Sequence, residues 1–327
     1  MGKRLAYGLS FGAMLFAPMA VYPIFLMNVL VFALFACAFN LLLGFAGLLS
    51  FGHAAFFGWS AYITGHMLME MNWPPLAGIL AGTVAGGSIG LIVGALSIRR
   101  QGIYFTMVTL ALAQMMYFLA LQMDFTRGED GLQGVPRGSL FGLIDLGNDL
   151  NMYYFVLAVF VGGYALIVRT VHSPFGQVLK AIKENEPRAI SLGYKVERYK
   201  LLAFVLSAAL AALAGATKTV VLGFATLTDV HWMMSGTVVL MTLVGGMGTL
   251  IGPVIGAAAI IFLEYRLDWL GKMLAASTNI NWFARLGDSA TVVIGCVFVV
   301  CVLAFRRGVA GEAKAYWARR TVTEQLL

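Results

Sequence analysis

Charged side chains are scarce in this sequence. Only 11% of the 327 residues are Asp, Glu, Lys or Arg, whereas 60% are hydrophobic, and the mean hydropathy is +0.86. Soluble domains carry about a quarter charged residues, so this composition excludes an ordinary water-soluble protein. Apolar runs long enough to cross a bilayer recur from end to end. The composition therefore predicts an all-α, polytopic helical integral membrane protein, with residues 1–327 forming a single transmembrane domain.

Cysteines are few, and the short motifs of soluble enzymes are lacking. Cys37, Cys296 and Cys301 lie inside apolar runs, so a disulfide framework is not expected. No segment has the G-x-x-x-x-G-K-[ST] spacing that cradles phosphates, and neither H-E-x-x-H nor C-x-x-C occurs. No Ser-His-Asp arrangement stands out. The sequence therefore predicts no enzyme activity, no metal site and no cofactor in this chain.

Ten apolar segments are candidate transmembrane helices. They are residues 6–25, 26–49, 53–69, 76–98, 103–121, 152–168, 201–222, 233–248, 250–267 and 289–305. With the N-terminus inside, their alternation places 16 of the 22 Lys and Arg residues on the inner side. Cationic loop residues resist translocation, so about ten spans with both termini cytoplasmic are expected. The net charge of +7 then reflects cytoplasmic loops and does not indicate nucleic acid as a partner.

Two details of these spans stay open. Residues 53–69 form a short span, and 233–267 can form either two helices or one broken hairpin. Two long loops follow from the same alternation. The outer loop, about 122–151, is mildly acidic, and the inner loop, about 169–200, holds seven Lys or Arg against three Glu.

Ionisable groups inside the predicted spans are rare. His53, Lys218 and Glu264 each lie near a span end, where a side chain can reach water at the membrane interface. Asn40 lies deeper, where its amide can bond a neighbouring helix or line a pathway. Proton-coupled and sodium-coupled carriers usually need intramembrane carboxylates, and no Asp or Glu occupies the centre of a span. This scarcity disfavours an ion-coupled carrier.

Glycines recur at four-residue spacing in two spans. Gly82, Gly86, Gly90 and Gly94 share one helix face, as do Gly248, Gly252 and Gly256, and such faces permit either close packing or helix sliding. We expect Pro253 to break its helix and free carbonyls that line a cavity. Residues 39–58 weakly resemble 240–259, which favours either a broken-helix repeat or two similar packing faces. The candidate pathway or helix-break residues are Asn40, Gly248, Gly252 and Pro253.

A concentrated charged stretch, KAIKENEPRAISLGYKVERYK, occupies 180–200. Ser173 and Pro174 suit the start of a helix that runs to about Glu184. Pro187 cannot continue that helix but can begin a second one, capped by Asn185 or Glu186, over PRAISL, which Gly193 closes. A helix of six residues cannot persist in water alone. It is therefore either a docking helix for another protein or a connector on the membrane surface.

Several segments carry a family resemblance. HSPFGQVLKAIKENEPRAISLGYKVERYKLLAFVLSAALAALAGA (172–216) resembles the cytoplasmic loop and following span of branched-chain amino acid ABC transporter permeases of the LivM type. NLLLGFAGLLSFGHAAFFGWSAY (40–62), RRQGIYFTMVTLALAQM (99–115), TRGEDGLQGVP (126–136) and LVGGMGTLIGPVIGA (243–257) resemble other family segments in family order. The outer loop departs slightly, with RGED where the family often has a Gly-Gly-x-Asp-like turn.

The resemblance assigns a role to the inner loop. In bacterial ABC importers a Glu-Ala-Ala…Gly loop couples the permease to its ATPase. Ala189 and Gly193 match that pattern, Pro187 and Arg188 do not, and Glu186 is displaced by one residue. The candidate ATPase-coupling residues are Glu186, Pro187, Arg188, Ala189, Ile190, Leu192 and Gly193.

The resemblance also implies partners and a location. It implies ABC ATPase subunits that hold ATP and Mg, a second permease subunit, a periplasmic substrate-binding protein and the lipid of the bacterial inner membrane. The implied function is import of branched-chain or related hydrophobic amino acids. Import of urea or short amides, a stand-alone secondary carrier or channel, and a non-transport scaffold are the alternatives.

Overall fold

The computed structural model describes residues 12, 14–19, 21–140, 142 and 144–278, together with isolated positions between 292 and 312. Apart from such positions, the expected span at 289–305 lies outside the described residues, as does the first part of the span at 6–25.

The described residues form mainly helices. In chain order these are η1 (Ala17–Met19), α2 (Pro23–Asn40), the π-helix η2 (Leu41–Ala46), α3 (His53–Met69), α4 (Pro75–Ser97), α5 (Ile103–Gln122), η3 (Asp124–Thr126), α6 (Asp149–His172), α7 (Pro174–Glu184), α8 (Glu186–Ser191), α9 (Val196–Leu222), α10 (Leu227–Val230), α11 (Trp232–Gly245) and α12 (Gly252–Thr278). Four short strands accompany them: β1 (Leu132–Gln133), β2 (Ser139–Leu140), β3 (Ile144–Asp145) and β4 (Phe224–Ala225).

The helices agree with most of the expected spans. Eight of the ten expected segments coincide with α2–η2, α3, α4, α5, α6, α9, α11 and α12. Residues 233–267 form two helices rather than one broken hairpin. Among the described residues, five segments are long and apolar enough to cross a membrane: Pro23–Ala46, Pro75–Ser97, Ile103–Gln122, Asp149–His172 and Val196–Leu222. A polytopic membrane protein follows, whereas the count of ten and the sides of the termini stay predictions.

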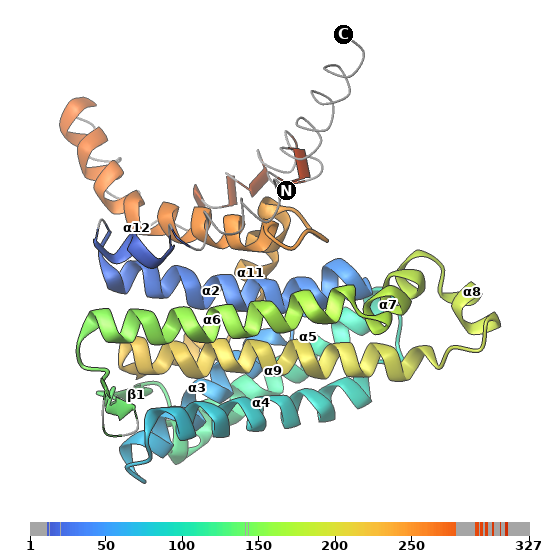
Figure 1. Cartoon of the computed structure of the whole chain (residues 1–327), viewed down its shortest axis with the longest axis horizontal. Helices are drawn as coiled ribbons and strands as arrows, with labels where there is room; N and C mark the ends of the chain where they lie inside the picture. The colour runs from blue at the N-terminus through green and yellow to red at the C-terminus, as the bar shows by residue number, and fades with distance from the viewer. Residues whose placement is uncertain are drawn as a thin grey trace.

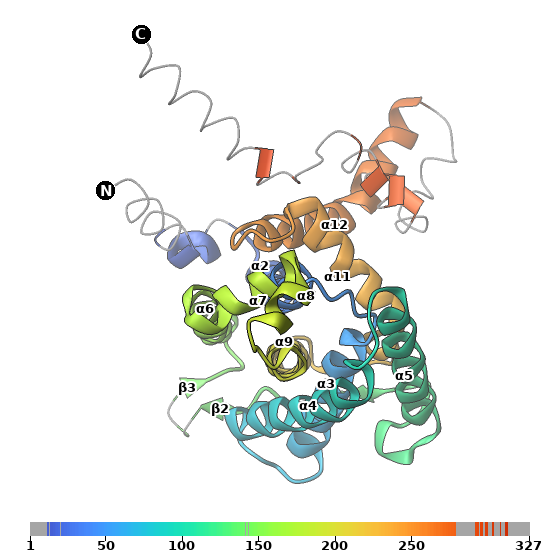
Figure 2. The same ribbon diagram turned by 90° about the vertical axis from the view of Figure 1, so that its right-hand side faces the viewer.

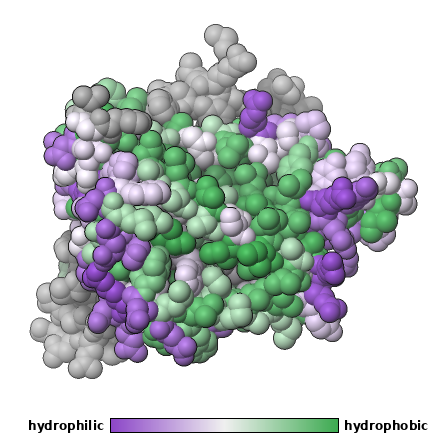
Figure 3. Space-filling view, turned by 90° about the horizontal axis from the view of Figure 1, so that it is seen from below, coloured by the Kyte–Doolittle hydropathy of each residue, from purple (hydrophilic) through white to green (hydrophobic). Residues whose placement is uncertain are grey.

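The surface has the polarity that a membrane requires. A broad apolar band covers the middle of the face in Figure 3, and polar residues gather at its two ends. Exposed apolar side chains on the outer face of α4, such as Leu80, Val84 and Leu91, contribute to the apolar surface. In lipid these side chains need no cover, because the hydrocarbon is as apolar as they are.

The centre of the bundle is formed by α2, α3 and α9 (Figures 1 and 2). Phe35 of α2 stacks on Phe57 of α3 with ring centroids 4.5 Å apart, and Phe204 of α9 is fully buried. The glycine face of α4 packs on the alanines of α9. A Cβ added at Gly86 would collide with the Cβ of Ala212, so close packing through small residues is confirmed on this face.

The loop between α5 and α6 folds over one end of the bundle (Figure 1). Its strand β1 pairs antiparallel with β4, with Leu132 opposite Ala225. Arg137 fastens the same loop, because it donates to the carbonyl of Val221 at 2.9 Å and to the Asp149 carboxylate at 2.7 Å. This loop end is opposite the end from which α7 and α8 project.

Candidate functional site

The segment from α7 to Gly193, here called the arm, projects from one end of the bundle (Figure 1). The hydroxyl of Ser173 accepts from the Gly176 N–H at 3.3 Å, which caps the first turn of α7 as expected. Leu179 and Ile182 lie on one face of α7 and are buried against the bundle. The sequence expectation of a helix from Pro174 to Glu184 is confirmed.

The second helix of the arm is short and capped at both ends. The side chain of Asn185 accepts from the Arg188 N–H at 3.0 Å, and Pro187 lies in the first turn, where its missing N–H has no helical acceptor to lose. After Ser191 the chain turns at Gly193, whose φ is +87°, and the Tyr194 N–H donates to the Ala189 carbonyl at 3.2 Å. The helix begins at Glu186 and ends at Ser191, one residue earlier than expected at each end.

The candidate coupling residues divide into an inner and an outer set. Ala189 is only 3% exposed and packs with Ile182 and Val196. Ile190 and Leu192 are 57% and 69% exposed, so two apolar side chains are accessible at the tip of the arm. Pro187, Arg188 and Gly193 are also exposed.

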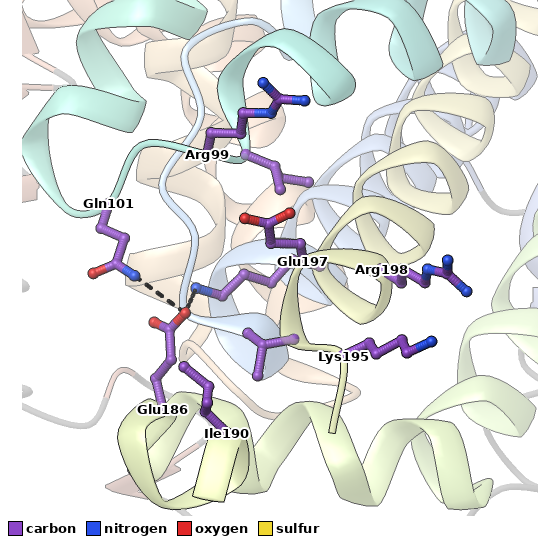
Figure 4. Close-up of a pocket in the computed structure, with 10 residues that line it drawn as sticks. Arg99, Gln101, Glu186, Ile190, Lys195, Glu197 and Arg198 are labelled. Carbon is purple, nitrogen blue, oxygen red and sulfur yellow. Dashed lines mark hydrogen bonds and ion pairs between the residues drawn. The ribbon is translucent and has the colours of Figure 1, made fainter. Parts of the chain in front are cut away.

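Glu186 holds α8 against the bundle. Its carboxylate lies 2.7 Å from the Nζ of Lys200 on α9 and accepts from the Gln101 amide at 3.2 Å. Figure 4 shows Gln101, in the loop between α4 and α5, pointing toward Glu186 at the start of α8. Both residues line a cavity between α8 and the bundle. This cavity, of about 380 Å³, is also lined by Arg99, Lys195 and Arg198. The ion pair anchors one edge of the helix. Ile190 also lines this cavity, whereas Leu192 does not.

A junction of two interrupted helices lies beside the arm. The side chain of Asn40 accepts from the Gly248 N–H at 2.9 Å and donates to the Thr249 carbonyl at 2.8 Å. The α2 end thereby joins the α11–α12 loop, 246–251. The two similar segments, 39–58 and 240–259, therefore contact each other. That they form an internal repeat stays a prediction.

The placement of Pro253 differs from the expectation. Pro253 is the second residue of α12, whose first turn needs no N–H from it, so it begins a helix and does not break one. The interruption lies in the preceding loop, where the Gly252 N–H donates to the Thr249 hydroxyl at 3.0 Å.

Irregular backbone also connects η2 with α3, at residues 47–52. Side chains of two neighbouring helices satisfy it: Thr106 donates to the Leu49 carbonyl at 3.0 Å, and Ser235 donates to that of Phe51 at 2.9 Å. Non-helical backbone at membrane depth requires such partners.

The expected access of His53 and Lys218 to water is wrong, because both side chains are buried. His53 is fully buried and its Nε2 lies 2.8 Å from the Ser207 hydroxyl. Lys218 is also buried, and its Nζ lies 2.6 Å from both carboxylate oxygens of Asp229. Glu264 is exposed as expected. Sequence reasoning missed Asp229, although the T-x-x-D spacing from Thr226, which forms a capping box, was a usable signal.

Comparisons with known proteins agree with this architecture. The family model for "Branched-chain amino acid transport system / permease component" matches residues 22–303. LivM, the high-affinity branched-chain amino acid transport system permease protein of Escherichia coli K12, is 26% identical over 281 residues, or 75% of this chain and 65% of that protein. LsrC, the autoinducer 2 import system permease protein of Klebsiella pneumoniae, is 32% identical over 182 residues, or 54% of this chain and 50% of that protein.

A solved structure, PsaBC from Streptococcus pneumoniae in complex with Fab, aligns over 89% of this chain and 95% of that chain with 13% identity. Its TM-score of 0.40 is too low to assign a shared fold.

The chain spans 65% of the length of LivM and half of the length of LsrC. The matched family model describes a permease component of a transport system, so this chain is a transport permease component. The family model covers most of the chain, and the protein therefore belongs to the family of branched-chain amino acid transport system permease components.

Proposed function

We propose that this protein is a membrane-spanning permease subunit of an ABC importer in the bacterial inner membrane. The observation that carries the proposal is the arm. It holds a short helix by an ion pair at one edge and leaves Ile190 and Leu192 exposed at its tip. A membrane-surface connector would turn such side chains toward the bilayer, whereas here they lie beyond the bundle at a polar end.

The partners follow from the arm and from the opposite end. An ATPase subunit that binds ATP and Mg docks on α8, and the chain described here offers one such arm for the two ATPases of an importer. A second permease subunit supplies the other. A periplasmic binding protein delivers substrate to the loop between α5 and α6, because this is the longest loop at the opposite end among the residues that the structure describes. ATP-driven closure of the ATPases then moves the arm.

The proposed substrates are branched-chain or related hydrophobic amino acids. The LivM relative supports this substrate class by its name, and LsrC is named for autoinducer 2, so the family spans more than one substrate. Urea and short amides are the alternative small substrates. A stand-alone carrier would transport substrate without any ATPase, and a scaffold would not respond to substrate at all. Both alternatives can therefore be distinguished from an importer by experiment.

The test is reconstitution of the permease with its co-encoded partners in proteoliposomes. We expect uptake of radiolabelled leucine, isoleucine or valine that requires the binding protein and internal ATP. Uptake without any ATPase would establish a stand-alone carrier. Uptake of urea but not leucine would assign the protein to the transport of urea or short amides. The absence of substrate-stimulated ATPase activity would favour a scaffold.

A pair of matched variants tests the docking site itself. Ile190→Ser is expected to release the ATPase from the purified complex, because an exposed apolar contact is lost. Ile103→Ser changes an isoleucine that is at least as exposed, 69% against 57% for Ile190. It is the first residue of α5 and lies outside the arm, so this variant should retain the ATPase. Equal retention of the ATPase by both variants would contradict docking on α8.

A further inference from the structure

The arm is tied to the interrupted end of α2 by one lysine. The Nζ of Lys183, in the last turn of α7, donates to the carbonyl of Gly44 in η2 at 2.7 Å. The last carbonyls of a helix have no intrahelical donor, and a cation at that end also suits the helix dipole. The side-chain stem follows the same course, since a Cβ added at Gly47, where φ is +74°, would lie 3.0 Å from the Cγ of Lys183.

The residue that receives this hydrogen bond also contacts the second interruption. A Cβ added at Gly44 would lie 2.7 Å from the backbone nitrogen of Gly248, so the two glycines pack backbone against backbone. Asn40, one turn before Gly44, bonds both Gly248 and Thr249. Lys183, Gly44, Asn40 and Gly248 therefore form an uninterrupted chain of contacts, here called the inner link, from the arm to the α11–α12 loop.

The arm has further connections, to α9, to the start of α5 and to η2. Glu186 ties α8 to α9 and to the start of α5 through Lys200 and Gln101. Lys180 lies over the ring of Phe45 at 5.7 Å, which is a weaker contact with η2. Among the described residues, Lys183 makes the hydrogen bond between α7 and η2. Leu179 of α7 also shares a buried apolar cluster with Leu42 and Ala46 of η2. Lys183 adds a directional polar link to this packing, so a displacement of α7 pulls on the Gly44 carbonyl at the end of α2.

We propose that Lys183 is a positioning residue for transport, which makes the end of α2 and the α11–α12 loop follow the arm. The proposal rests on the proposed function, since the ATPases are what move the arm. Both Gly-rich interruptions lie at the arm end of the bundle, where a pathway must open inward. Small residues at these points let backbones shift past one another without side-chain collisions. The inner link therefore converts arm movement into a change at the inner end of the pathway.

The functional test uses the complete reconstituted complex and three variants. Lys183→Met removes the donor, Lys183→Arg keeps it, and Lys195→Met removes an exposed charge from the same loop. Assembly, ATPase rate and uptake are measured together. For Lys183→Met we expect normal assembly and ATP hydrolysis with about tenfold less substrate imported per ATP, the size expected on losing a hydrogen bond from a charged donor. Lys183→Arg and Lys195→Met should stay near the wild-type ratio.

A structural readout separates linkage from simple support. Spin labels at Glu184→Cys on α7 and Met247→Cys in the α11–α12 loop, in a chain whose native cysteines are replaced by alanine, report one distance across the inner link. We expect this distance to stay constant when ATP is trapped in the wild-type background and to change when Lys183→Met is added.

The outcomes bear on different proposals. A wild-type transport ratio in Lys183→Met, an equal loss in Lys195→Met, or a wild-type distance that changes with ATP would overturn the inner link and leave the importer intact. Loss of assembly in both Lys183→Met and Lys183→Arg would reduce Lys183 to a structural contact. Wild-type complex that shows no ATP-dependent uptake would overturn the proposed function and the inner link together.

Discussion

Breaking the Lys218–Asp229 ion pair should destabilise the bundle more when one partner is removed than when both are neutralised. The two side chains are only 7% and 2% exposed, and Nζ lies 2.6 Å from each carboxylate oxygen. In Lys218→Met, the Asp229 carboxylate still accepts a hydrogen bond from the Thr226 N–H at 3.1 Å, but it loses the positive charge that neutralises it. An uncompensated buried charge destabilises a protein by about 3–5 kcal/mol.

The double variant Lys218→Met/Asp229→Asn removes both charges. The introduced asparagine side chain would keep an acceptor oxygen for Thr226, so the cap of α10 stays satisfied while no charge is left buried. Replacing a buried ion pair by neutral side chains is often neutral or stabilising, so we expect the double variant within about 1 kcal/mol of wild type. The non-additivity between the single and double variants is the quantity that the structure predicts.

Unfolding in mixed micelles with increasing SDS, followed by circular dichroism, measures these differences. The control is Arg127→Met, which breaks the Arg127–Glu70 pair at 3.2 Å, where both side chains are about half exposed, 48% and 53%. Surface pairs contribute under about 1 kcal/mol, so this variant should differ little from wild type. A Lys218→Met variant as stable as Arg127→Met, or a double variant as unstable as the sum of the singles, would refute the reasoning.

Two further predictions concern glycines. The Gly193→Pro complex should assemble but hydrolyse ATP without uptake, because proline cannot adopt the φ of +87° and lacks the N–H that donates to the Ile190 carbonyl. Gly193→Asn is the control, since asparagine tolerates that φ. Wild-type uptake by the proline variant would contradict the prediction. Gly86→Ala should destabilise the bundle by about 1–3 kcal/mol in the same SDS assay, because the added Cβ collides with that of Ala212. Gly87→Ala is the control, because a Cβ there would lie 3.4 Å from the Cβ of Ala209 and should be tolerated. Equal stabilities of the two variants would refute the packing argument.

Local features of this fold could be predicted from the sequence because their causes are local. Ser173, Pro187 and Gly193 act on the turns in which they lie, so both helices of the arm were expected within one residue. The span at 53–69 was recognised by its apolar run, although it has only 17 residues. Periodicity also identified the glycine face of α4, since four-residue spacing needs no knowledge of the partner helix.

Features that depend on distant partners could not be predicted. The T-x-x-D spacing could mark Asp229 as a cap of α10, but it could not show that the turn after α9 folds this carboxylate back onto Lys218, 11 residues earlier. Asn40 was recognised as a candidate, but its partners Gly248 and Thr249 are 208 and 209 residues away in the chain. The π-helix at Leu41–Ala46 has no distinct apolar period, and it leaves the Gly44 carbonyl free for Lys183.

The two kinds of contact in this bundle imply where it can move. Between α4 and α9, glycine meets alanine along several turns, and any shift would force backbone into side chains at every turn, so these helices should move as one body. At the arm end, a small apolar cluster around Leu179, a few hydrogen bonds and a glycine–glycine approach join α7, the end of α2 and the α11–α12 loop. Breaking or re-forming one of these hydrogen bonds changes stability by about 1–3 kcal/mol, the upper part of that range applying to the charged Lys183, and this is small enough for ATP-driven movement to exploit. A transport cycle should therefore displace the arm and the two interruptions while the α4–α9 packing stays intact.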